Sequence, residues 1–131
     1  MAHYTHSKVK RNGFQHIKDN GDLVVILKAP LKADNWATTQ SKILAQSAIA
    51  NGDMFLTDVG DDLQFTSNPK SGIDPDLSAA NTDDIAAAIL DTVNQEVLIV
   101  QDIVDKDILN ADGDTITIPG LSVFCRELSL I

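Results

Sequence analysis

Short runs of β-branched and aliphatic residues, each bounded by turn-forming residues, constrain the fold of this chain more than any other feature. The clearest run is Leu23–Leu27, which follows the turn signal Asn20-Gly21-Asp22 and precedes Pro30. Branched side chains favour strands because they pack well on a pleated surface, whereas Gly and Pro interrupt strands. Because Leu23–Leu27 is apolar at every position, we predict a strand that is buried on both faces.

Several later segments repeat this pattern. The sequence predicts further strands at residues 54–57, 63–66, 96–100, 115–118 and 121–128. In Thr115–Ile118 the threonines are expected on one face and the isoleucines on the other. Asn51-Gly52-Asp53 and Asp112-Gly113 are predicted hairpin turns in which glycine supplies a positive φ. Many short strands with closely spaced turns predict a mainly β fold, a small single-domain β-sandwich or β-barrel.

Two segments fit either a helix or a strand. Residues 43–50 are compatible with either a helix or a strand. Residues 85–90 are alanine-rich, and Thr82 is a suitable N-cap for a helix there. We prefer a strand for residues 85–90, because the segment is short and leads through a turn at 91–95 into the strand at 96–100.

The length of 131 residues suits one domain with a core of its own. Residues 1–20 are polar and partly basic, and they predict an N-terminal arm that is either extended or a short helix. Residues 21–131 are predicted to form a single β-rich domain. Within it, residues 32–42 are expected to be a loop, and residues 68–81 a long central loop with two prolines.

Charge is distributed unevenly along the chain. The net charge is −9, but residues 1–32 carry six basic and two acidic side chains, which leaves −13 for the remainder. Such an acidic body repels phosphate backbones, so we expect no nucleic-acid binding. We also expect no membrane span, since no run approaches the roughly 20 apolar residues that one needs, and no signal peptide. The chain is expected to be made in a cytoplasm.

The stretch from Ile108 to Phe124 resembles a cation-binding loop at first sight. Asn110, Asp112 and Asp114 would be its first, third and fifth ligands. An EF-hand loop needs glycine at the sixth position and a closing glutamate, but here Gly113 falls at the fourth and the glutamate is missing. The stretch therefore predicts a hairpin turn whose flanking strands pair.

No residue pattern in the chain indicates catalysis. His3 and His6 are three residues apart but have no third ligand for zinc on a fixed backbone. Cys125, the single cysteine, excludes an internal disulfide, and its apolar neighbours predict a buried, unreactive thiol. Acidic pairs such as Asp61-Asp62 fall in predicted turns. We expect a protein that is not an enzyme and that holds no cofactor and no metal.

Several features of the sequence favour assembly with a partner. Strands that are apolar on both faces, such as Leu23–Leu27 and Val97–Val100, need a second cover from a loop, a helix or another subunit. Trp36 fits either a core position under a loop or an interface anchor. The predicted partner contacts are Lys8, Lys10, Arg11, Trp36, Leu130 and Ile131.

Four motifs give the chain a resemblance to a known group of proteins. They are GDLVVILKA at 21–29, ANGDMFLTD at 50–58, AILDT…EVLIV at 88–100 and ADGDTITIP at 111–119. In layout, over most of residues 20–125, the chain resembles small virion proteins of tailed bacteriophages. Such proteins are β-rich and act as capsid decoration (cement) proteins or as head–tail and tail components.

The resemblance implies a capsid decoration protein, located on the virion, that ties neighbouring capsomers of the major capsid protein together. It also implies a homo-oligomer, for which we expect a trimer. A tail, neck or fibre-base protein of the virion is the first alternative. A cation- or carbohydrate-binding β-module is the second, and its ligands would be Asp105, Asp107, Asp112 and Asp114.

Overall fold

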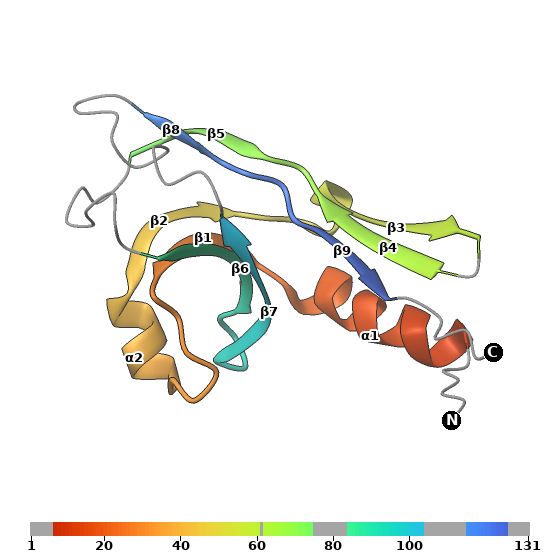
Figure 1. Cartoon of the computed structure of the whole chain (residues 1–131). Coiled ribbons are helices and arrows are strands. Elements are labelled where there is room, and N and C mark those ends of the chain that lie inside the picture. Colours follow the sequence, from red (N-terminus) through yellow and green to blue (C-terminus); the bar gives the residue numbers. More distant parts are fainter. Residues whose placement is uncertain (1–6, 61, 75–83, 104–114, 126–131) are drawn as a thin grey trace.

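The structure is a computed structural model, and it describes residues 7–60, 62–74, 84–103 and 115–125 (Figure 1). At residues 7–11 and at Cys125 it describes the backbone alone. The elements are α1 (Ser7–Asn20), β1 (Leu23–Lys28), α2 (Trp36–Ser41), β2 (Ile43–Ala48), the 3-10 helix η1 (Asn51–Asp53), β3 (Met54–Val59), β4 (Asp62–Ser67), β5 (Lys70–Ile73), β6 (Ile85–Asp91), β7 (Glu96–Ile103), β8 (Ile116–Ile118) and β9 (Ser122–Cys125).

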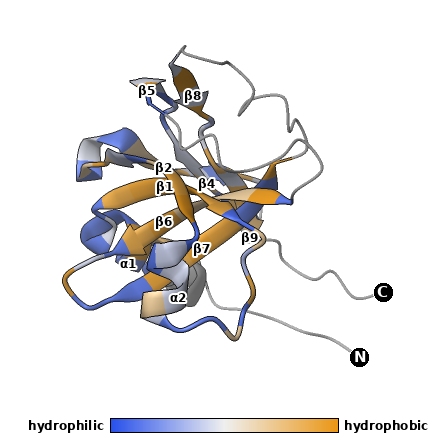
Figure 2. Ribbon diagram, turned by 90° about the vertical axis from the view of Figure 1, so that its left-hand side faces the viewer, coloured by the Kyte–Doolittle hydropathy of each residue, from blue (hydrophilic) through white to orange (hydrophobic). Residues whose placement is uncertain are grey.

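The first layer is a four-stranded antiparallel sheet with the strand order β2-β1-β6-β7. β1 and β6 are its central strands, and Val24 of β1 lies opposite Ile89 of β6. The residues of β6 are buried along the whole strand. Figure 2 shows hydrophobic residues following one another along β1, β6 and β7. A strand with this composition needs cover on both of its faces.

The second layer is a long antiparallel ribbon that crosses the first layer (Figure 1). One half of it is the three-stranded sheet β3-β4-β9, and the other half is the pair β5-β8. At the bend, the backbone N–H of Ser67 donates to the carbonyl of Leu121 (3.0 Å), and the N–H of Leu121 donates to the Ser67 hydroxyl oxygen (2.8 Å). These two bonds continue the pairing across the short break between the two halves.

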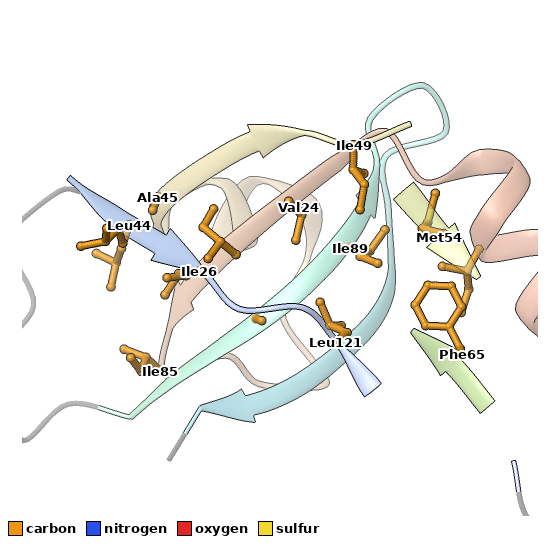
Figure 3. Close-up of a cluster of buried hydrophobic side chains, with 14 residues drawn as sticks. Val24, Ile26, Leu44, Ala45, Ile49, Met54, Phe65, Ile85, Ile89 and Leu121 are labelled. Atoms are coloured by element: carbon orange, nitrogen blue, oxygen red, sulfur yellow. The ribbon is translucent and has the colours of Figure 1, made fainter. Parts of the chain in front are cut away.

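The core lies between the two layers. Ile26 and Ile89 of the first layer meet Phe65 and Leu121 of the second, and all four side chains are buried (Figure 3). Ile17 of α1 closes one end of this cluster. Two layers around a shared core make the fold a β-sandwich, as predicted, and in the described part of the chain the sheets do not close into a barrel.

A smaller buried cluster covers the opposite face of the first layer. It consists of Val25, Leu27, Ala88 and Leu90, and Trp36 of α2 packs against it. The second cover that Leu23–Leu27 was expected to need is therefore supplied within the chain, by α2. Residues 32–42 were predicted to be a loop, and that prediction is wrong for α2. Asn35 caps this helix, because its side-chain oxygen accepts from the Thr38 N–H (2.8 Å).

The N-terminal arm is helical where it is described, so of the two predicted alternatives the helix is correct and the extended arm is wrong for Ser7–Asn20. Phe14 and Ile17 are one turn apart on α1 and both pack on the core, with the Phe14 ring centroid 5.7 Å from that of Phe65. The helix ends where the Gly21 N–H donates to the Ile17 carbonyl (2.8 Å). Phe14 and Ile17 therefore anchor the helix on the core.

Other predicted elements are confirmed or corrected. Residues 85–90 are a strand, as preferred, and residues 43–48 are also a strand. Asn51-Gly52-Asp53 forms a 3-10 turn instead of a hairpin, and among the described glycines Gly60 and Gly72 have a positive φ. The predicted long loop contains β5, while residues 75–83 lie outside the described part.

The strand after the predicted cation-like turn has an unexpected partner. Ile116 and Ile118 are buried and Thr117 is exposed, as the alternation predicted. Among the described residues β8 pairs with β5, and Ile118 lies opposite Lys70. β7, the described strand on the other side of the turn at Asp112-Gly113, pairs with β6. That turn lies outside the described residues, and the predicted pairing of β7 with β8 across it is not found in the described part of the chain.

Gly120 provides a test of the bend in the ribbon. A Cβ at this position would lie 2.1 Å from the carbonyl oxygen of Ser67. Because backbone on both sides would have to move, we expect Gly120→Ala to lower the free energy of unfolding by about 3 kcal/mol or more in urea titrations. Gly13→Ala is the control: nothing lies within 4 Å of its Cβ, and in the helix it is expected to stabilise by about 0.5–1 kcal/mol. Equal stability of the two variants would contradict this account of the bend.

Candidate interaction surfaces

A groove of about 350 Å³ lies between β7 and the loop that follows β1. We call it the β7 groove, and its apolar lining includes Leu27, Leu31, Val97 and Val100. Val97 and Val100 lie opposite Leu90 and Ala88 of β6, so they extend the smaller buried cluster toward solvent. This is the part of the first layer that α2 leaves accessible.

The exposure of the lining residues is high for aliphatic side chains. Leu31 is 66% exposed, Val100 44% and Val97 39%. Single exposed apolar residues are common on protein surfaces, but a concave group of them beside the core is typical of an interaction site. Within the described residues, β7 is also an edge strand, with β6 as its neighbour.

Lys42 organises the wall of the groove opposite β7. Its ammonium donates to Asp34 Oδ2 (2.7 Å) and to the carbonyl of Ala29 (3.0 Å), and Asp34 Oδ2 also accepts from the Leu31 N–H (2.9 Å). The hydrogen bond from Lys42, together with that from Leu31, holds the pKa of Asp34 below its ordinary value, although burial acts in the opposite direction. These contacts hold the loop that presents Leu31.

Ala29 turns the chain out of β1 and into this loop. Its φ of 43° is in the left-handed region, which is unusual for a residue with a Cβ. The Ala29 N–H donates to the carbonyl of Asp84 (2.7 Å). The turn is therefore held by backbone bonding on one side and by Lys42 on the other, so the groove has a preformed wall.

The outer face of β3-β4-β9 is a second surface with exposed apolar side chains. Phe55 is 45% exposed and Val59 46%, and both point away from the core because Met54 and Leu56 alternate with them. Across the sheet, Thr57 lies opposite Gln64, which donates from Nε2 to the Ser122 hydroxyl oxygen (2.9 Å). This outer face mixes aromatic, β-branched and polar residues.

Asp91 and Asp22 form a polar cluster at the turn between β6 and β7. The Asp91 carboxylate accepts from the Asn94 side chain (2.7 Å) and from the N–H groups of Val93 and Asn94 (both 3.1 Å). Asp22 accepts from the N–H (3.0 Å) and the hydroxyl of Thr92. These bonds close the turn, so the two carboxylates have structural roles. In the described part of the chain, no three His, Cys, Asp or Glu side chains gather as a metal site would require.

The predicted contact residues fall in three places. Lys8, Lys10 and Arg11 are on α1, where the structure describes the backbone alone. Trp36 is half-buried against the smaller cluster, which agrees with the core alternative for this residue.

The remaining predicted residues lie elsewhere. Leu130 and Ile131 are outside the described residues, and so are Asp105, Asp107, Asp112 and Asp114. Sequence reasoning pointed to Val97–Val100 as apolar on both faces but missed Leu31 and Phe55. Only the alternation in Met54–Val59 gave a signal for Phe55.

Asp91 is expected to make stability depend on pH in the acid range. Hydrogen bonds from Asn94 and the Val93 N–H hold its pKa below the ordinary value, so the ionised form stabilises the fold. That contribution is present at neutral pH and is lost as pH falls through the lowered pKa, below about 4. We expect Asp91→Asn to lower the Tm by several degrees at pH 7, and the difference from the parent to shrink below pH 4 in thermal melts.

Glu96→Gln is the matched control for this prediction, because Glu96 is an exposed carboxylate opposite Asp91 in the same turn. We expect it to leave the Tm nearly unchanged. A difference between Asp91→Asn and the parent that stayed constant from pH 7 to pH 3 would show that the charge of Asp91 has no such role.

Comparison with known proteins adds no relative. No protein-family model, no curated protein and no solved structure matches the chain. Among the described residues, no helix is both long enough and apolar enough to cross a membrane.

Proposed function

We propose that the chain is a virion structural protein of the capsid decoration type, which binds the outside of a shell between neighbouring capsomers of the major capsid protein. The observation that carries the proposal is the β7 groove. Its apolar lining is continuous with the core, and its far wall is held in place by Lys42. A preformed apolar groove receives a side chain or segment of a partner with little loss of entropy on the side of the groove.

The motifs behind the phage resemblance support the proposal. GDLVVILKA contains β1, ANGDMFLTD contains η1 and most of β3, AILDT…EVLIV contains the β6–β7 turn, and ADGDTITIP contains β8. These motifs thus account for strands in both layers of the sandwich, and the layout on which the resemblance rests is a layout of real strands.

Decoration suits a small groove for an energetic reason. One groove of about 350 Å³ takes up one or two side chains, so a single contact is weak. A shell repeats the site many times, and a protein that binds only the assembled state stabilises it by mass action. Weak contacts therefore add up to a measurable effect on the particle.

Leu31→Ser tests the proposal in a co-sedimentation assay with shells of the phage whose genome encodes the chain. Leu31 lines the groove and is largely exposed, so the variant is expected to fold. Because an apolar contact at the centre of an interface is worth at least about 1.4 kcal/mol, we expect at least tenfold weaker binding.

Val93→Ser is the matched control, since Val93 is 84% exposed but lies in the β6–β7 turn, away from the groove lining. It is expected to bind like the parent. Equal binding of the Leu31 and Val93 variants would remove the groove from the proposal. If the bound protein were found at one vertex of the particle and not over the whole shell, it would be a neck or tail protein instead.

A further inference from the structure

In the part of the chain that the structure describes, β3 is an edge strand of the second layer. The strand order there is β3-β4-β9, so the described residues place β4 on one side of β3 and no strand on the other (Figure 1). The edge strands of the first layer, β2 and β7, both carry irregular register, whereas β3 pairs with β4 without a shift over six residues. Bulges protect sheet edges from further pairing, and β3 lacks this protection.

The direction in which the backbone groups of β3 point follows from one hydrogen bond at Asp53, the residue just before the strand begins. The Asn68 N–H donates to the carbonyl of Asp53 (2.8 Å), so residues 53 and 68 form a hydrogen-bonded pair. In an antiparallel ladder such pairs alternate, which places the odd-numbered residues of β3 in bonds to β4. The N–H and C=O groups of Leu56 therefore point away from β4, toward the edge of the sheet.

The exposed side chains of β3 are arranged symmetrically about Thr57. Phe55 and Val59 lie two residues on either side of it, on the same outer face, and all three are exposed. If a second β3 pairs antiparallel about a two-fold axis at Thr57, each Phe55 faces Val59 of the second copy, and the two Thr57 side chains face one another. Aromatic–β-branched and Thr–Thr pairs are among the favourable cross-strand pairs.

This register also agrees with the hydrogen-bonding pattern of the β3 backbone. The facing pairs on the outer side are odd-numbered, so they are non-hydrogen-bonded pairs, in which the Cα atoms are only about 4.5 Å apart and side chains are closest. Leu56 of each copy lies between these pairs, where its backbone groups can supply ladder hydrogen bonds. A shift by one residue would place the outer face of one copy beside the core face of the other.

We propose that two copies of the chain associate through β3, in the register that pairs Thr57 with Thr57, and so form a continuous six-stranded sheet. The interface offers six residues of β3 per copy, far fewer than the roughly 20–30 per side of a stable interface. The free chain therefore dimerises weakly, and the pair is most populated where copies are concentrated. This association is two-fold, in contrast to the trimer expected from the sequence, and it does not rest on the proposed function.

A cysteine at the symmetry axis tests the pairing. In a Cys125→Ala background, we expect Thr57→Cys to give a covalent dimer under mild oxidation, because facing non-hydrogen-bonded positions approach the separation that a disulfide needs. Thr66→Cys is the matched control: Thr66 is on the same sheet, directly opposite Phe55, but β4 is a central strand and cannot meet its own copy. A dimer fraction no greater for Thr57→Cys than for Thr66→Cys would overturn the proposal.

The register is tested with two chains mixed in equal amounts, one with Phe55→Cys and the other with Val59→Cys, both in the Cys125→Ala background. The proposed register predicts disulfides between the two variants and few within either. Predominant disulfides between like variants would overturn the register. Sedimentation of the parent and of Thr57→Lys then gives an independent readout, since two ammonium groups at the axis are expected to abolish the weak dimer. Equal association of these two proteins would count against pairing at β3.

Discussion

Burial of β1 and β6 on both faces is the constraint on which the rest of this structure depends. Five or more consecutive apolar residues in each central strand must be removed from water on two sides, and one sheet cannot do this alone. The ribbon covers one face and α2 covers part of the other. The order of the layers, with the four-stranded sheet in the middle, follows from that requirement.

The bend in the ribbon decides how the first face is covered. A straight pair of strands would follow one line across the sheet, whereas the break at Ser67 and Leu121 lets one ribbon form both β5-β8 and β3-β4-β9. Gly120 permits the close approach there, because its missing Cβ leaves room for the Ser67 carbonyl. In the described part of the chain, β3 is consequently an edge strand of that three-stranded sheet, with β4 beside it.

Incomplete cover of the second face leaves the β7 groove. α2 is only six residues long, and it reaches the cluster around Val25 and Leu90 but leaves Val97 and Val100 exposed. The groove belongs to the first layer and the β3 edge to the second, so the two proposed contacts use different elements (Figure 1). Binding to a shell protein and pairing with a second copy are therefore compatible in the same molecule.

The strands were largely predictable because their signal is local. Leu23–Leu27 and residues 85–90 are enriched in residues that suit a buried pleated surface, and turn residues bound them. The helices were not predictable in the same way. Among the side chains of α1 that the structure describes, Phe14 and Ile17 pack on the core, and α2 has an Asn35 cap but no periodic apolar stripe. Both owe their stability to contacts with distant strands.

By itself the amino-acid sequence determined the strand content, the alternation at Ile116–Ile118 and the β-rich class, since these depend on side-chain branching and on neighbours along the chain. Only the tertiary structure decided that β8 pairs with β5, that Trp36 packs against the smaller buried cluster and that Leu31 and Phe55 are exposed. Strand partners and surface exposure depend on which apolar faces meet across the fold, and that choice is made by the free energy of the whole packed core.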